Sequence, residues 1–150
     1  MIKILPFAFI LMIVWSSCGK MKTQAEVDDQ TIQDYLTLHK LMAIKDPSGL
    51  YYIMNVTGTG ISPTVASTIE VKYVGTLVNG SIFDQTAADK TFIYALSGLI
   101  KGWQIGIPLM KKGGKATFFI PSALGYGGID AGPIPASSVI IFEIELIDVK

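Results

Sequence analysis

Residues 68–83 read TIEVKYVGTLVNGSIF, and from Ile69 to Tyr73 apolar side chains alternate with polar ones. This period of two is typical of a β-strand that has one buried face and one solvated face. Asn79 and Gly80 follow, and this pair accepts the positive φ angles of a tight hairpin turn. The segment therefore predicts two antiparallel strands joined by a short turn.

Three further apolar runs have the composition of strands. They cover residues 50–56, 116–120 and 139–149, and the last of them is rich in β-branched side chains. Between them, residues 99–110 could form one short helix, which Pro108 interrupts. Antiparallel strands that cross one short helix predict an α+β fold.

A second helix is expected ahead of the strands. Ile32, Tyr35, Leu36 and His39 have the spacing of one helical face, and Asp28 or Asp29 could cap its first turn. We interpret His39 as a half-buried helix residue without a catalytic role. The predicted organisation is a signal peptide over 1–17, a flexible tether over 18–29, a helix over 30–47 and one folded domain over 48–150.

The N-terminal segment has the pattern of an export signal. Lys3 precedes an apolar run from Ile4 to Trp15, and two serines and Cys18 follow directly. Twelve residues of helix would span only about 18 Å of a hydrocarbon core that is about 30 Å thick. The small residues before Cys18 resemble a bacterial lipobox, in which the cysteine is lipidated, although Trp15 stands where leucine is usual. A plain secretory signal, or an uncleaved anchor with an incidental Cys18 thiol, is the alternative.

The composition argues against several classes of function. The 150 residues carry twelve lysines and no arginine against twelve acidic residues, and this balance does not favour nucleic-acid binding. One cysteine and one histidine cannot supply a structural zinc site or an internal disulfide. We therefore expect no metal, no cofactor and no nucleic-acid partner.

Five segments between Thr68 and Lys150 form a characteristic series. They are VKYVG at 71–75, NGSIFD at 79–84, IKGW at 100–103 followed by GIPLM at 106–110, KATFFIP at 115–121 leading to Tyr126, and IFEIEL at 141–146. In this order they resemble the FK506-binding-protein (FKBP) family of peptidyl-prolyl cis-trans isomerases, and the helix that precedes them resembles that of exported bacterial members. The resemblance implies an antiparallel, twisted β-sheet wrapped on one short helix.

The resemblance also implies a catalytic pocket for a proline ring. Trp103 would form its floor, and Tyr73 and Phe83 would form walls. Tyr126 would donate a hydrogen bond to a substrate carbonyl, and Asp84 would lie against the twisted carbonyl. Many family members pair this aspartate with an arginine, but residues 85–91 contain none, and Lys90 is the candidate substitute.

Five further positions are implied to contact the substrate. Phe142 would complete the wall, while Ile100 and Leu99 would offer a side chain and a backbone amide. Ile134 would belong to a loop that closes over the site. Phe92 would contact the residue that precedes proline.

Such a pocket could act without a nucleophile or a metal. Rotation breaks amide resonance, so the twisted X-Pro bond is less polar than either planar form, and an apolar site favours it. The expected partners are proline-containing unfolded or nascent chains in the bacterial envelope, FK506-like macrolides as inhibitors, and a membrane reached through the lipid. A binding or chaperone lipoprotein that uses the same pocket without catalysis is the alternative.

Overall fold

The computed structural model describes residues 21–150. The predicted signal peptide, the lipidation site Cys18 and the first part of the predicted tether therefore lie outside the described residues. No helix within residues 21–150 has the length and apolar character needed to cross a bilayer.

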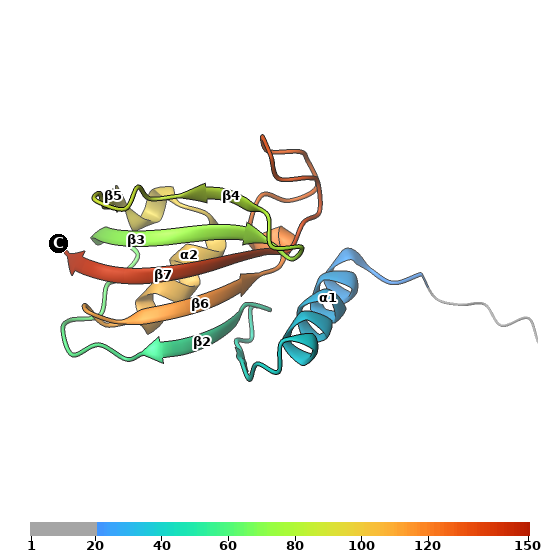
Figure 1. Cartoon of the computed structure of the whole chain (residues 1–150), viewed down its shortest axis with the longest axis horizontal. Coiled ribbons are helices and arrows are strands. Elements are labelled where there is room, and N and C mark those ends of the chain that lie inside the picture. Colours follow the sequence, from blue (N-terminus) through green and yellow to red (C-terminus); the bar gives the residue numbers. More distant parts are fainter. Residues whose placement is uncertain (1–20) are drawn as a thin grey trace, which may run out of the picture.

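Within residues 21–150, seven strands form one antiparallel sheet, which confirms the expected α+β architecture (Figure 1). The order across the sheet is β1-β2-β6-β7-β3-β4, and β5 also pairs with β3. The bounds are β1 Ile44–Lys45, β2 Tyr51–Val56, β3 Thr68–Leu77, β4 Ile82–Gln85, β5 Phe92–Ala95, β6 Lys115–Ile120 and β7 Ile140–Val149.

The predicted hairpin joins β3 to β4. Gly80 adopts φ +86°, and its N–H donates to the Leu77 carbonyl at 2.9 Å. Along β3, Ile69 and Val71 are fully buried, while Glu70 and Lys72 are partly exposed. The period of two thus identified both the strand and its buried face, because side chains alternate across a sheet.

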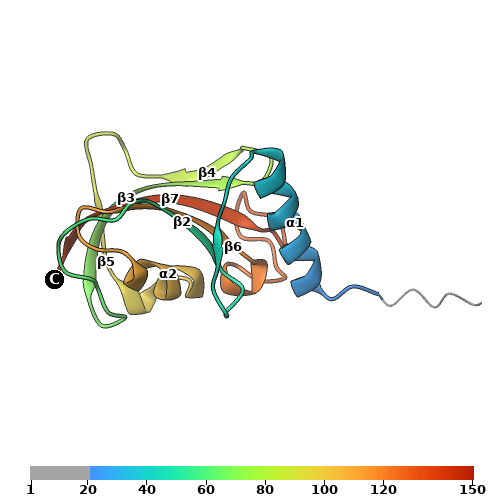
Figure 2. The same ribbon diagram turned by 90° about the horizontal axis from the view of Figure 1, so that it is seen from below.

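The short helix α2 (Lys101–Gly106) lies beneath one face of the sheet and encloses the main core there (Figure 2). It continues into the 3-10 turn η2 (Ile107–Leu109), which contains the expected Pro108. Two other 3-10 turns are η1 (Leu96–Gly98) and η3 (Ser122–Leu124). Gly106 allows close packing of α2, because a Cβ there would lie 2.7 Å from the Phe118 ring.

The N-terminal helix differs from its prediction at both ends. Helix α1 covers Gln24–Leu38 rather than 30–47, so residues 24–29 of the expected tether are helical. Its cap is Thr23 rather than Asp28 or Asp29. The Thr23 hydroxyl accepts the Glu26 N–H, and the Glu26 carboxylate accepts the Thr23 N–H, which is a capping box. The helix ends before Lys40, which has φ +54°.

Helix α1 packs at one end of the sheet, opposite to the C-terminus (Figure 1). Its buried Ile32 and Leu36 form a second cluster with Tyr51, Phe119 and Ile141. These last three belong to β2, β6 and β7 and lie on the sheet face opposite to α2. Burial of an aliphatic side chain of this size stabilises by about 1.5–3 kcal/mol. His39 is exposed at the helix end, so the expected half-burial is wrong. Its ring contacts that of Tyr35 in a tilted arrangement, with the centroids 4.1 Å apart.

Candidate functional site

Aromatic rings from four elements meet at α2. The indole of Trp103 is approached edge-on by Tyr73 from β3, Phe92 from β5 and Phe142 from β7. The ring centroids lie 5.3, 6.4 and 5.1 Å from that of Trp103, with interplanar angles of 81°, 89° and 88°. These are preferred geometries for aromatic pairs, each worth about 0.5–1.5 kcal/mol beyond area burial. The structure thus brings together residues that are scattered over 70 positions of sequence.

The indole itself is nearly covered. Trp103 is 4% exposed and Phe142 is 3% exposed, whereas Tyr73 and Phe92 are partly exposed. The indole Nε1 is buried without a hydrogen-bond partner among residues 21–150. An unpaired buried donor costs about 1–3 kcal/mol, so this tryptophan is not placed for maximal stability. The accessible part of the cluster consists mainly of the rings around the expected floor.

Phe83 joins the cluster through Phe142, with ring centroids 5.4 Å apart and an interplanar angle of 90°. Both rings press against the backbone of Gly75 in β3. A Cβ at Gly75 would lie 2.7 Å from two atoms of the Phe83 ring and 2.8 Å from the Phe142 ring. The glycine in the VKYVG motif therefore permits the close packing of these two rings on β3.

Asp84 accepts a hydrogen bond from the Tyr73 hydroxyl at 2.6 Å. Burial, and then the hydrogen bond to this carboxylate, raise the pKa of Tyr73 well above the usual tyrosine value, so the phenol stays a donor. Asp84 takes part in no ion pair among the described residues, and Lys90 does not replace the missing arginine. The support of the carboxylate is a tyrosine hydroxyl instead.

Tyr126 lies on the loop after η3 and is 39% exposed. Burial, and then the negative charge of Asp84, raise the pKa of its phenol. The charge of Asp84 thus raises the pKa of both the Tyr73 and the Tyr126 phenol, so both hydroxyls stay protonated donors.

The segment before α2 has a different donor from the one expected. The Leu99 N–H donates to the Leu96 carbonyl at 3.1 Å, and the Leu99 carbonyl accepts from the Gln104 side chain at 2.7 Å. The N–H of Ile100, by contrast, has no partner among residues 21–150. Sequence reasoning missed Gln104, because a polar side chain that folds back on its own loop carries no motif.

Two other residues lie in or beside the cluster. Ile134 is 4% exposed, and its carbonyl accepts the Ala131 N–H at 2.8 Å. Its side chain belongs to the same core cluster as Trp103 and Phe142. Tyr94, which the sequence analysis did not single out, stacks on Phe92 with centroids 5.6 Å apart and planes 6° apart.

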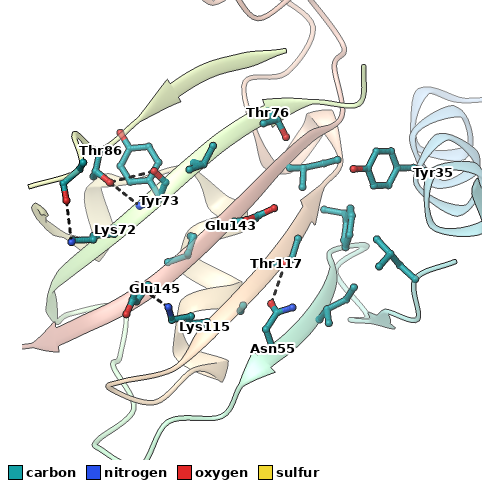
Figure 3. Close-up of a pocket in the computed structure, with 18 of the residues that line it drawn as sticks. Tyr35, Asn55, Lys72, Tyr73, Thr76, Thr86, Lys115, Thr117, Glu143 and Glu145 are labelled. Atoms are coloured by element: carbon teal, nitrogen blue, oxygen red, sulfur yellow. Dashed lines mark hydrogen bonds and ion pairs between the residues drawn. The ribbon is translucent and has the colours of Figure 1, made fainter. Parts of the chain in front are cut away.

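A separate hollow of about 570 Å³ lies on the opposite sheet face, between α1 and the segment after β4 (Figure 3). Polar side chains from neighbouring strands line much of it, and several are already paired. Lys115 pairs with Glu145 at 3.2 Å, and Thr117 donates to Asn55 at 3.1 Å (Figure 3). These groups satisfy one another, so the aromatic cluster is the better candidate site.

Metal ligands do not gather in the described part of the chain. Within residues 21–150, no three side chains of the histidine, cysteine, aspartate or glutamate type lie close enough to hold one ion. The chemistry available at the cluster is therefore that of apolar rings, hydroxyls, one carboxylate and a free backbone N–H.

Comparison with known proteins finds a family that matches more than half of the chain. The family described as FKBP-type peptidyl-prolyl cis-trans isomerase matches residues 60–147. The chain is 37% identical over 140 residues to the FKBP-type isomerase FkpA of Buchnera aphidicola, which covers 89% of this chain and 56% of the relative. It is 41% identical over 106 residues to the outer membrane protein MIP of Legionella longbeachae, with 69% and 46% covered.

The fold matches as well. The crystal structure of a peptidyl-prolyl cis-trans isomerase from Pseudomonas syringae superposes with a TM-score of 0.72 at 30% identity, over 87% of this chain and 98% of that chain. This confirms the FKBP-like fold. The chain spans about half the length of the curated relatives named above.

Proposed function

This chain belongs to the family of FKBP-type peptidyl-prolyl cis-trans isomerases, and we propose that it accelerates cis-trans rotation of X-Pro bonds at the aromatic cluster around Trp103. The observation that carries the proposal is the convergence of Tyr73, Phe92 and Phe142 on one indole, with Asp84 and Tyr126 beside them. Hydroxyls at the edge of an apolar surface can bind a ligand that has one apolar ring and adjacent carbonyl groups.

The chemistry needs no covalent step. The barrier to rotation about an X-Pro bond is about 18–20 kcal/mol, so that the bond isomerises in about 10–100 s unaided. A twisted imide has lost resonance and polarity, so rings that exclude water stabilise it relative to both planar forms. In this proposal Trp103 forms the floor, and Phe142 forms a buried part of the wall. The partly exposed Tyr73, Phe83 and Phe92 form the accessible part of the wall.

The polar groups orient the peptide. Tyr126 is proposed to donate its hydroxyl proton to a substrate carbonyl, and its raised pKa keeps that proton in place at neutral pH. The free N–H of Ile100 is a second donor, in place of the Leu99 amide. Asp84, oriented by Tyr73, faces the carbonyl carbon of the rotating bond. Phe92 is proposed to contact the residue that precedes proline, and Ile134, which packs in the same cluster as Trp103, is proposed to close the site.

The proposed substrates are proline-containing chains that are still unfolded, and FK506-like macrolides are proposed inhibitors of the same pocket. A protease-coupled assay on an X-Pro peptide tests the activity directly. We expect Tyr126→Phe to lower kcat/KM by roughly two- to tenfold, the worth of one neutral hydrogen bond. Tyr35→Phe is the matched control, because Tyr35 lies on the other sheet face (Figure 3).

The outcomes separate the two functions considered. Acceleration by the parent and by Tyr35→Phe, but less by Tyr126→Phe, supports the isomerase. If the folded parent binds FK506 and gives no acceleration, the isomerase proposal fails and a binding or chaperone module is left.

We further propose that the protein is held at a bacterial envelope membrane by lipid on Cys18. The support is the apolar run before two serines and Cys18, together with the likeness to an outer membrane protein. Metabolic labelling with a fatty-acid analogue tests this proposal. Label on the parent that disappears in Cys18→Ala is expected, and label that survives the substitution would overturn it.

A further inference from the structure

A buried carboxylate connects α1 to the loop that carries Tyr126. Asp28 is 2% exposed, although it was expected only as a helix cap. Its Oδ2 accepts the Ser122 N–H at 2.8 Å and the Ser122 hydroxyl at 2.6 Å. Its Oδ1 accepts the Gln24 side-chain amide at 2.7 Å. Both oxygens are therefore occupied, and no ion pair involves Asp28 among residues 21–150.

Ser122 is the point from which the Tyr126 loop is built. Its carbonyl accepts the N–H groups of Gly125 and Gly127, at 3.0 and 2.8 Å. These two residues flank Tyr126. The Gly127 carbonyl in turn accepts the Ser137 N–H at 2.8 Å. A displacement of Ser122 would therefore move both ends of the tyrosine backbone segment.

The Asp28–Ser122 hydrogen bonds are not needed merely to attach α1 to the sheet. Ile32 and Leu36 already attach α1 to the sheet through apolar contacts. A carboxylate that is buried without a cation is expensive unless donors are held in place for it, and here both donors of one serine serve it. The contact joins residues 94 positions apart, and it ends next to the loop of the proposed site.

We infer that Asp28 is a positioning residue, through which the N-terminal helix holds the Tyr126 hydroxyl at the pocket. The inference rests on the proposed isomerase function. It predicts that loss of the Asp28 contact acts on catalysis through Tyr126 and through no other group. The helix is then a working part of the catalytic unit rather than a spacer ahead of it.

A double-mutant cycle on the full chain tests the inference. We expect Asp28→Ala to lower kcat/KM roughly two- to tenfold, as Tyr126→Phe does, and to cause no further loss when it is added to Tyr126→Phe. Asp28→Asn keeps an acceptor oxygen and should retain most of the activity. Asp34→Asn is the matched control, because Asp34 is exposed on the same helix and should leave kcat/KM unchanged. Equal losses from Asp28→Ala in both backgrounds would overturn the inference.

A second readout does not depend on activity. Titration of the Tyr126 phenol, followed by NMR with labelled tyrosine and assigned with Tyr126→Phe, should show its pKa falling towards the ordinary value in Asp28→Ala. It should not change in Asp34→Asn. An unchanged Tyr126 titration in Asp28→Ala would overturn the inference, whether or not the parent has isomerase activity. A parent without isomerase activity would overturn only the proposed function. If Asp28→Ala does not fold, Ser122→Ala removes one of the two hydrogen bonds and is judged by the same criteria.

Discussion

Gly75→Ala tests whether the Phe83 and Phe142 rings form a wall of the catalytic pocket. The new methyl group would lie 2.7 Å from the Phe83 ring, whereas ordinary contact begins at about 3.4 Å, so the rings must move by about 0.7 Å. Overpacking of this kind costs about 1–3 kcal/mol of unfolding free energy. For a chain of this size, each kcal/mol lowers Tm by about 2–4 °C.

The effect on catalysis should exceed the effect on stability. Displacement of reacting groups by about 1 Å can cost about 100-fold in rate, so we expect kcat/KM for an X-Pro peptide to fall at least about tenfold. The assay is protease-coupled isomerisation, run well below the Tm of every variant. Thermal unfolding of the same samples reports the stability.

Gly106→Ala is the matched control. A methyl group there would also lie 2.7 Å from a phenylalanine ring, but this ring is Phe118 in the core. The backbone at Gly106 has φ −77° and ψ −42°, which alanine adopts freely. Both variants should lose stability, and only Gly75→Ala should lose activity to the stated extent. If Gly75→Ala is destabilised and keeps the parent kcat/KM, the two rings are not a wall of the site.

The remaining predictions concern other members of the site and the docking of α1. Trp103→Ala should abolish isomerase activity and lower the free energy of unfolding, measured by urea denaturation, by about 3–5 kcal/mol. Trp103→Phe should stay folded and be less active than the parent. Parent-like activity of either variant would show that Trp103 is not part of the pocket. Tyr73→Phe removes the hydrogen bond to Asp84 and should lower the free energy of unfolding by about 0.5–1.5 kcal/mol. The loss is small because Asp84 is exposed and water can replace the lost donor. An unchanged urea midpoint would contradict this. The hydrogen bond from Lys45 holds the pKa of Asp29 below its usual value. The Lys45–Asp29 pair therefore stabilises the folded state above about pH 4, and this contribution is lost as the pH falls and Asp29 is protonated. The urea midpoint should therefore fall less between pH 7 and pH 3 in Lys45→Met than in the parent, by a small amount because both side chains are substantially exposed.

Local pattern was sufficient for most of the sheet. The alternation along β3, the turn at Gly80 and the apolar runs of β6 and β7 were all predicted, because side-chain alternation and turn conformation depend on neighbouring residues. Strand β5 was not predicted, although Phe92 within it was identified. Four residues at the edge of a sheet carry too short a pattern, and their pairing with β3 depends on contacts far along the chain.

The start of α1 differs from its prediction, although the sequence contains the pattern that specifies it. Thr23 and Glu26 have the spacing of a capping box, and this pattern predicts a helix start more strongly than an isolated Asp28 or Asp29. Asp28 looked like a cap because it precedes the apolar face. The contact that explains it lies with Ser122, and helix periodicity contains no information about such a distant partner.

The amino-acid sequence alone determined the α+β class, the family and the identities of the aromatic residues, since these are properties of composition, period and motif order. Tertiary folding decided which groups meet. It brings the aromatic rings onto Trp103, places Tyr73 rather than a cation beside Asp84, and bonds Asp28 to Ser122 at the start of the Tyr126 loop. It also decided that the indole is nearly covered and that Ile100 rather than Leu99 keeps a free N–H. These features follow from burial and from competition for hydrogen-bond partners, which exist only once distant segments have packed together.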